Sequence, residues 1–334
     1  NPRLCFAVLK AVIAGDVLNA NGYRIRPYEV VQGTTEKALA DGRVWIASAL
    51  KKRTSILVAM WKVRRRLARV EVDRLQAKPK VSIIGEFWAM TTEGDGNYHL
   101  QKFLESEGAE VDVQLVTAWL LYNIWILRYD TRKRMTLRGE DGSRFGLAGV
   151  NIRKRLINLW LAEVGLKSVF KLYANFMGLS GYHLPDQGEI ARLAKEHYPN
   201  ELRGGEGHME VGKLIQTVIK KKAHMVVSVK PFGCMPSSGV SDGVQSLITK
   251  KHPEAIFCAI ETSGDGAVNV QSRVQMFLFK ARKKAREELD QVLQRRGWSL
   301  EKARICLGSG WKRALNYPKH RGLAGTGANV IQGD

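Results

Sequence analysis

Cysteine is scarce in this sequence, and its few thiols are spread along the chain. No two cysteines form a Cys-x-x-Cys pair, and their spacing is not that of a disulfide framework. This pattern favours a reducing, cytoplasmic setting. The thiols must converge in space if they are to share a ligand: Cys5, Cys234, Cys258 and Cys306.

The chain also lacks a long hydrophobic run and a nucleotide-phosphate motif. The longest apolar stretch, VTAWLLYNIWILRY at 116–129, is too short to span a bilayer, so we expect a buried helix and no membrane span. No GxxxxGK(S/T) motif occurs, which gives no support to ATP hydrolysis by a P-loop. No basic-then-apolar signal segment opens the sequence and residue 1 is Asn, so we expect a piece of a longer protein or a processed product.

Acidic residues are few relative to basic ones. The 32 Asp and Glu face 53 Lys and Arg, which gives a net charge of +21, and much of the excess lies at 51–74, 128–138 and 279–286. In the first patch, apolar residues recur at helical spacing between basic ones, which predicts an amphipathic helix presenting Arg64, Arg65 and Arg66. No aromatic-interleaved basic motif accompanies the patch, so a solvated face is favoured over nucleic-acid binding.

Four short β-rich runs each lie next to a helical segment. Strands that alternate with helices predict a parallel sheet covered on both faces. We therefore expect an α/β fold with parallel, Rossmann-like sheets. The runs are KPKVSIIGEF at 78–87, GAEVDVQLVT at 108–117, AHMVVSVK at 223–230 and EAIFCAIE at 254–261.

Two strand-containing segments resemble each other, which predicts two related lobes. Residues 81–105 and 254–278 both run from a strand through a Thr-containing loop into Gly-Asp-Gly, then Asn, then an amphipathic helix. The expected regions are a helical N-terminal region at 1–77, continuing from upstream sequence, α/β lobes at 78–117 and 223–300, a helical insertion or cap at 118–222 and a C-terminal segment at 301–334.

Cys234 is the thiol with the most reactive surroundings. It lies in KPFGCMPSSGVSDGVQ, directly after a predicted strand. Amides of a glycine-rich loop would lower the pKa of such a thiol and hold it as the thiolate, the form that binds metal; an ordinary turn cysteine is the alternative. Cys258 lies inside a strand, where a buried structural thiol is expected, and Cys5 and Cys306 also lie in apolar company.

The Gly-Asp-Gly loops are the second candidate feature. In an open parallel sheet, ligands bind beyond the carboxyl ends of the strands, where these loops fall. We expect the loops and the Cys234 loop to line one connected cleft. The two aspartates could cap the following helices or accept hydrogen bonds from a ligand, and capping is favoured. The residues expected to shape a cofactor site are Gly94, Asp95, Gly96, Gly233, Gly264, Asp265 and Gly266.

The segment NELRGGEGHMEVGK opens a predicted helix with glycines. Glu206, Glu210 and Lys213 are spaced about one turn apart there, beside His208. The segment could bind an anion through its amides and Lys213, but helix capping explains the pattern equally well. A nucleophilic cysteine would need a histidine partner, and no histidine has a recognisable spacing to Cys234.

Several of these motifs together resemble a known family. VSIIGEFWAMTTEGDGNYHLQKFLESEGAEVDVQLVTAWLLYN, VVSVKPFGCMPSSGVSDGVQSL and AIFCAIETSGDGAVNVQSRV are similar to the 2-hydroxyacyl-CoA dehydratase and CoA-enzyme-activase-related proteins. The resemblance covers residues from about 5 to about 286. It implies α/β lobes that hold a cysteine-ligated iron–sulfur cluster, 4Fe–4S or related, which an ATP-dependent activase supplies with single electrons for radical dehydration of a 2-hydroxyacyl-CoA.

By this resemblance Cys234 is the candidate cluster ligand. Such a cluster needs several thiolates, and only Cys234 lies in a plausible ligand loop, so we expect an incomplete cluster site. The expected partners are an activase region or subunit, an acyl-CoA substrate and a sister subunit. The alternatives are a non-catalytic α/β docking module and a basic nucleic-acid-binding protein.

Overall fold

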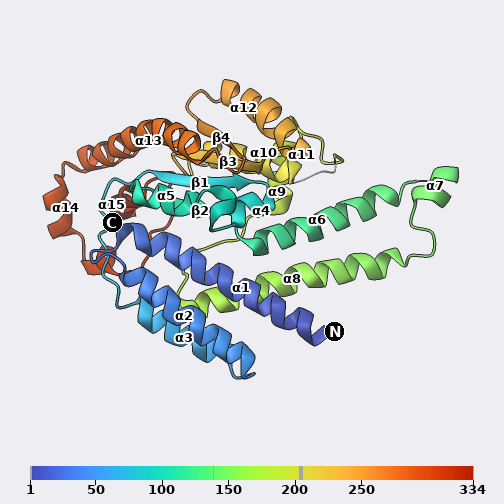
Figure 1. Cartoon of the computed structure of the whole chain (residues 1–334), viewed down its shortest axis with the longest axis horizontal. Coiled ribbons are helices and arrows are strands. Elements are labelled where there is room, and N and C mark those ends of the chain that lie inside the picture. The colour runs from blue at the N-terminus through green and yellow to red at the C-terminus, as the bar shows by residue number, and fades with distance from the viewer. Residues whose placement is uncertain (1, 138, 203–205, 334) are drawn as a thin grey trace.

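Four parallel strands form the centre of the fold (Figure 1). The computed structural model describes residues 2–137, 139–202 and 206–333. All four predicted β-rich runs contain a strand, because each has a short series of β-branched residues that can be buried on both faces. In the order in which they pair across the sheet, the strands are β2 (Glu110–Val113), β1 (Lys80–Gly85), β3 (Met225–Pro231) and β4 (Ile256–Thr262).

Helices cover both faces of this sheet, as the sequence predicts. Ile83 and Val227 point into one core, while Ile84 and Val226, one residue along, point into the other. The first face is covered by α4 (Phe87–Thr91), α5 (Leu100–Ser106) and α13 (Ala267–Arg296). The second is covered by α9 (Gln187–Ala194), α10 (Gly207–Ile219) and α12 (Gln245–Lys251).

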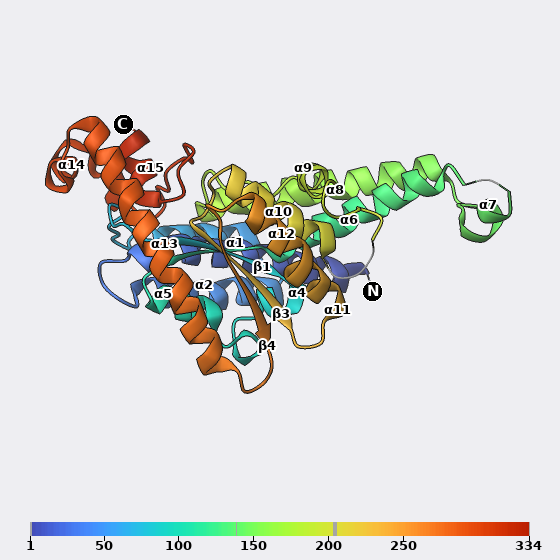
Figure 2. The same ribbon diagram turned by 90° about the horizontal axis from the view of Figure 1, so that it is seen from above.

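A helical bundle lies beside the sheet and has its own core. Met60, Val63 and Phe170 are among its buried residues. Two of its helices extend away from the sheet side by side and carry α7 (Gly139–Phe145) at their far end (Figures 1 and 2). The bundle helices are α1 (Pro2–Ile25), α2 (Thr34–Lys51), α3 (Ile56–Leu67), α6 (Val116–Arg134) and α8 (Ile152–Met177).

The predicted basic helix is shorter than residues 51–74. Lys51 ends α2, Arg53 has a left-handed φ of 54°, and a new helix begins at Ile56. Arg64 and Arg65 are exposed on this helix, whereas Arg66 is half-buried. The patch therefore consists of a helix end, a turn and a separate helix.

The C-terminal segment packs across the amino end of the sheet and has a third core, with Leu75, Leu289 and Ile331. Its elements are α14 (Leu300–Cys306), η4 (Ser309–Lys312) and α15 (Thr326–Gly333). Short elements elsewhere are η1 (Arg26–Tyr28), η2 (Asp95–Asn97), α11 (Met235–Ser238) and the π-helical η3 (Gly239–Val244).

The expected pair of lobes is not confirmed. The two similar segments begin with β1 and β4, and both strands belong to the one four-stranded sheet, on either side of β3. The similarity therefore lies within one sheet, and the two connections differ: α4 follows β1 before the first Gly-Asp-Gly loop, whereas β4 leads directly into the second loop and α13.

One helix among the described residues, Arg3–Tyr28, is long and apolar enough to cross a bilayer by length and composition. The core helix of a soluble protein can meet the same criteria, and 39% of the apolar window is buried inside the fold.

Candidate functional site

The strand order creates a switch point between β1 and β3. The chain leaving β1 forms α4 and α5 on one face, whereas the chain leaving β3 forms α12 on the other. Connections that diverge in this way leave a crevice outside the carboxyl ends of the two strands, where open α/β sheets bind ligands. The Cys234 loop follows β3 at this edge.

Gly85 lets β1 and β3 approach closely at the switch point. Its φ is 130°, and a Cβ atom at this position would lie 2.1 Å from the carbonyl oxygen of Val229. The amide of Glu86 donates to the same oxygen at 2.8 Å. A residue with a side chain would therefore force the two strands apart where the candidate site begins.

Cys234 is half-buried and directly precedes α11. Gly233 before it has a left-handed φ of 75°, which turns the chain away from the strand. The amide of Cys234 donates to Pro231 O at 3.2 Å, and its carbonyl accepts from Ser238 N at 2.9 Å. The backbone of the loop is therefore held in place, and no hydrogen bond between described residues involves the Cys234 thiol.

A buried carboxyl group lies beneath this loop. Glu210, on α10, is 2% exposed, and its oxygens accept hydrogen bonds from Ser237 Oγ at 3.1 Å and Ser228 Oγ at 3.3 Å. Burial, followed by the charge of Glu206, raises the pKa of Glu210 to about 8, although the two serines lower it. Glu210 therefore holds its proton at neutral pH.

Glu206 is a second carboxyl group at the start of the same helix. It is also buried, and its Oε1 accepts a hydrogen bond from the indole of Trp119 at 3.0 Å. Burial is the main cause that raises its pKa to about 7, and the charge of Glu86 adds to it. At neutral pH Glu206 is therefore partly protonated, whereas Glu210 holds its proton. Two carboxyl groups with raised pKa values thus lie close together at the switch point.

The amides of the predicted anion site belong in part to residues 203–205, which lie outside the described residues, so that site stays a prediction; Lys213 lines a different cavity. The alternative, an acidic helix start, is confirmed in part. Glu210 lies in the first turn of α10, but the side chain of the N-cap residue Glu206 makes no capping hydrogen bond. One feature of the sequence could have indicated these buried carboxyl groups: two glutamates lie one turn apart at the start of a largely apolar helix.

The two Gly-Asp-Gly loops are neighbours in space. Tyr98, next to the first loop, accepts a hydrogen bond at its hydroxyl from the amide of Ser263, next to the second, at 2.7 Å. Gly264 has a left-handed φ of 43°, whereas Gly94 has extended backbone. The parallel register puts both loops and the Cys234 loop at the carboxyl edge, and the cleft expected to join them stays a prediction.

The expected capping by the two aspartates is wrong. The N-cap residue of α13 is Gly266 and that of α5 is His99, and neither helix has a side-chain cap. Asp265 is exposed, and Asp95 pairs with His99 Nε2 at 2.9 Å. The helices begin beyond the aspartates, at Ala267 and Leu100, so these carboxylates do not serve as N-caps.

The other three cysteines differ in their burial. Cys258 is buried in β4 as expected, and burial raises the pKa of its thiol to about 11. Cys5 and Cys306 are exposed although their sequence neighbours are apolar, so the structural role expected for them is not a place in the core. Both lie on helices, and their thiols are not part of the core.

Two of the candidate histidines lie at the end of the sheet opposite Cys234. His224 accepts a hydrogen bond from the amide of Lys80 at the amino end, and His252 lies before β4, at the same end. His208, in the first turn of α10, packs against the rings of Tyr122 and Trp125 at centroid distances of 5.0 and 4.7 Å. His99, at the carboxyl edge, pairs with Asp95.

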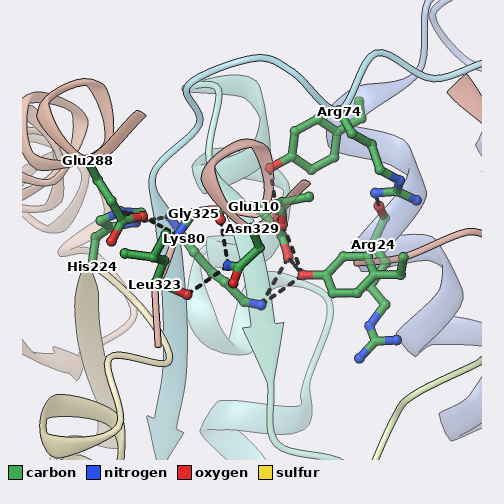
Figure 3. Close-up of polar contacts among 12 residues, drawn as sticks. Arg24, Arg74, Lys80, Glu110, His224, Glu288, Leu323, Gly325 and Asn329 are labelled. Carbon is green, nitrogen blue, oxygen red and sulfur yellow. Dashed lines mark hydrogen bonds and ion pairs between the residues drawn. The ribbon is translucent and has the colours of Figure 1, made fainter. Parts of the chain in front are cut away.

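A second polar cluster lies at the amino end of the sheet, and no sequence motif predicted it (Figure 3). Glu110 is 1% exposed and accepts hydrogen bonds from the hydroxyls of Tyr28, Tyr317 and Thr326. Its carboxylate also pairs with Lys80 Nζ at 3.2 Å. Burial alone would raise the pKa of Glu110, but Lys80 and then the hydroxyl groups lower it, so the pair is charged.

The same region explains the glycine-rich segment GLAGTGAN. The amides of Ala324 and Gly325 donate to Glu288 at 3.0 and 2.7 Å, and Glu288 also lies 3.4 Å from His224 Nε2 (Figure 3). Asn329 closes the turn by donating to the carbonyl of Leu323 at 2.8 Å. The turn in this segment therefore holds the Glu288 carboxylate through backbone amides.

Comparison of the chain with protein-family models, curated proteins and solved structures finds no match. Membership of the dehydratase and activase-related family therefore stays a prediction from the sequence pattern.

Proposed function

We propose that this chain is a domain of a 2-hydroxyacyl-CoA dehydratase-like iron–sulfur system, in which Cys234 is a cluster ligand. The observation that carries the proposal is the place of this thiol, half-buried in a glycine loop at the switch point of a parallel sheet. The resemblance of this loop and of the Gly-Asp-Gly segments to the family supplies the reaction class, ATP-driven single-electron transfer for radical dehydration.

The described residues do not fit a complete cluster by themselves. Among them, no group of three or more Cys, His, Asp or Glu is arranged to hold a metal ion. An iron–sulfur cluster needs several thiolates, and Cys234 is the single thiol that follows a strand at this edge. The remaining ligands would come from an activase region or a sister subunit.

Exposed apolar side chains support a partner at this edge. Phe232 is 75% exposed and Met235 is 83% exposed, and these residues flank Cys234 in the sequence. Trp88, in the connection that follows β1, is 72% exposed. Large apolar groups gathered at one edge favour contact with another protein. The same observation favours a second candidate function, a docking module that retains the α/β scaffold without a cluster.

Anaerobic purification followed by iron and sulfide assays separates the two candidates. The full-length protein, with any subunit that co-purifies, should bind iron and show charge-transfer absorption. The Cys234→Ser variant should lose both, while Cys258→Ser and Cys306→Ser should retain them as matched buried and exposed controls. Loss in Cys258→Ser but not in Cys234→Ser would contradict the proposed ligand, and wild-type protein without iron would favour the docking module.

A further inference from the structure

A cationic cavity lies at the amino end of the sheet, the end opposite the Cys234 loop. Its volume is about 210 Å³. The first residues of β1 and the edge strand β2 form one wall, and α10 contributes Lys213. The connection between α8 and α9 and the C-terminal segment close the other sides, with Tyr182 and Tyr317 among the lining residues.

Positive charge predominates in this cavity. Arg24, Lys80, Lys213 and Lys222 line it, and Asp112 is the one carboxylate among the described lining residues. The charge of Lys80 is balanced by Glu110 at 3.2 Å. Three cations therefore face one carboxylate, which leaves an excess of two positive charges.

These three cations lack an acidic partner at contact distance among the residues that the structure describes. Lys213 makes no hydrogen bond or ion pair with any described residue. Lys222 Nζ donates to the uncharged amide oxygen of Gln216 at 3.0 Å. Arg24 donates to the carbonyl oxygen of Ser180 at 3.1 Å. Neutral oxygens satisfy some of the N–H groups but do not neutralise the charge.

The titration of neighbouring groups agrees with the same excess of charge. Burial lowers the pKa of Lys222 to about 8, and the charge of Lys213 is the second largest cause. Burial, then Lys80 and Lys222, lower the pKa of His320, which also lines the cavity. A buried lysine with a neighbouring lysine is stabilised when an anion enters between them.

We propose that this cavity binds the phosphate group of a small phosphorylated molecule. A phosphate dianion matches the excess of two charges, and lysine and arginine are the side chains that bind phosphate through charge-assisted hydrogen bonds. The cavity is larger than a phosphate group alone, and its lining includes the apolar residues Pro185, Pro318 and Leu323, which can contact an organic portion. The site is separate from the Cys234 edge and does not depend on the iron–sulfur proposal.

Calorimetric titration of the full chain with inorganic phosphate and with phenyl phosphate, at constant ionic strength in chloride, tests the proposal. Both ligands should bind at one site, and phenyl phosphate should bind more tightly because the cavity accommodates an organic portion. Lys213→Gln and Lys222→Gln should each weaken binding by roughly tenfold, the loss expected for one charge-assisted contact. Lys171→Gln, which removes an exposed lysine on α8, should leave affinity unchanged.

Asp112→Asn provides a test that misfolding cannot imitate. Removing the single opposing carboxylate of the described lining should tighten phosphate binding several-fold, because one repulsive charge is lost. Lys213→Arg should retain binding. Absence of phosphate binding to the wild-type chain at millimolar concentration, or equal losses in Lys213→Gln and Lys171→Gln, would overturn the proposal.

Discussion

Replacing Glu210 with Gln should change the way in which stability depends on pH. Glutamine has nearly the same shape, keeps hydrogen-bonding partners for Ser228 and Ser237, and is neutral at every pH. Wild-type Glu210 is neutral only while it holds its proton. The two proteins should therefore have similar free energies of unfolding in mild acid and should diverge as the pH rises.

The direction and size of this divergence follow from the pKa of Glu210. The folded protein holds the pKa at about 8, above the ordinary value of 4.5. A raised pKa gives stability that is fully present below the unfolded value and is lost as pH rises through the folded value. Each tenfold difference in acidity between the folded and unfolded states corresponds to about 1.4 kcal/mol. By about pH 9 the free energy of unfolding of wild type should therefore fall by at most about 5 kcal/mol relative to that of Glu210→Gln.

Urea unfolding of both proteins at several pH values between about 5 and 9 measures the divergence. Glu206→Gln should reduce the effect, because the charge of Glu206 helps to raise the pKa of Glu210. Glu189→Gln is a control that should show no pH-dependent divergence over this range, since the pKa of Glu189 is lowered, chiefly by Lys220, and its contribution is lost only below the ordinary value of 4.5.

A difference between wild type and Glu210→Gln that stays constant over this pH range would refute the reasoning. Wild-type protein that gains stability over the variant as the pH rises through the folded pKa would refute it as well. Either result would mean that Glu210 is ionised at little cost in the folded protein. The proton-holding role assigned to the switch point would then be lost.

Three further predictions concern other parts of the molecule. Glu110→Gln should destabilise the protein by about 3 kcal/mol in urea unfolding, because it leaves the half-buried Lys80 without its carboxylate; a loss below about 1 kcal/mol would contradict a charged pair. Gly85→Ala should cost about 3 kcal/mol or more because of backbone overlap and its positive φ, while Gly165→Ala, with open space around it, should be neutral or stabilising; equal effects would show that the strands can separate freely. Replacing Arg64 and Arg65 together with Gln should leave RNA binding weak and unchanged, and a steep, salt-dependent affinity lost in this variant would instead assign the helix to nucleic acid.

The sequence by itself determined the secondary structure around the site and the class of fold. Short β-branched runs between helical segments predict four buried parallel strands, because only such runs can be covered on both faces. The place of Cys234 after a strand follows from the same local pattern, as does the burial of Cys258. Helix bounds were less predictable, since the turn at Arg53 divides a continuous basic, amphipathic pattern.

Only the tertiary structure decided which groups titrate abnormally and where charge collects. From the sequence alone, Glu210 is an ordinary acidic residue in the first turn of a helix. In the structure, the start of α10 packs beneath the carboxyl end of β3, and the carboxyl group of Glu210 is removed from water. Arg24, Lys213 and Lys222 carry no shared motif, yet α1 and the distant segment of α10 and its C-terminal connection bring them to one cavity. Burial and charge depend on distances between segments far apart in the chain, and packing alone sets those distances.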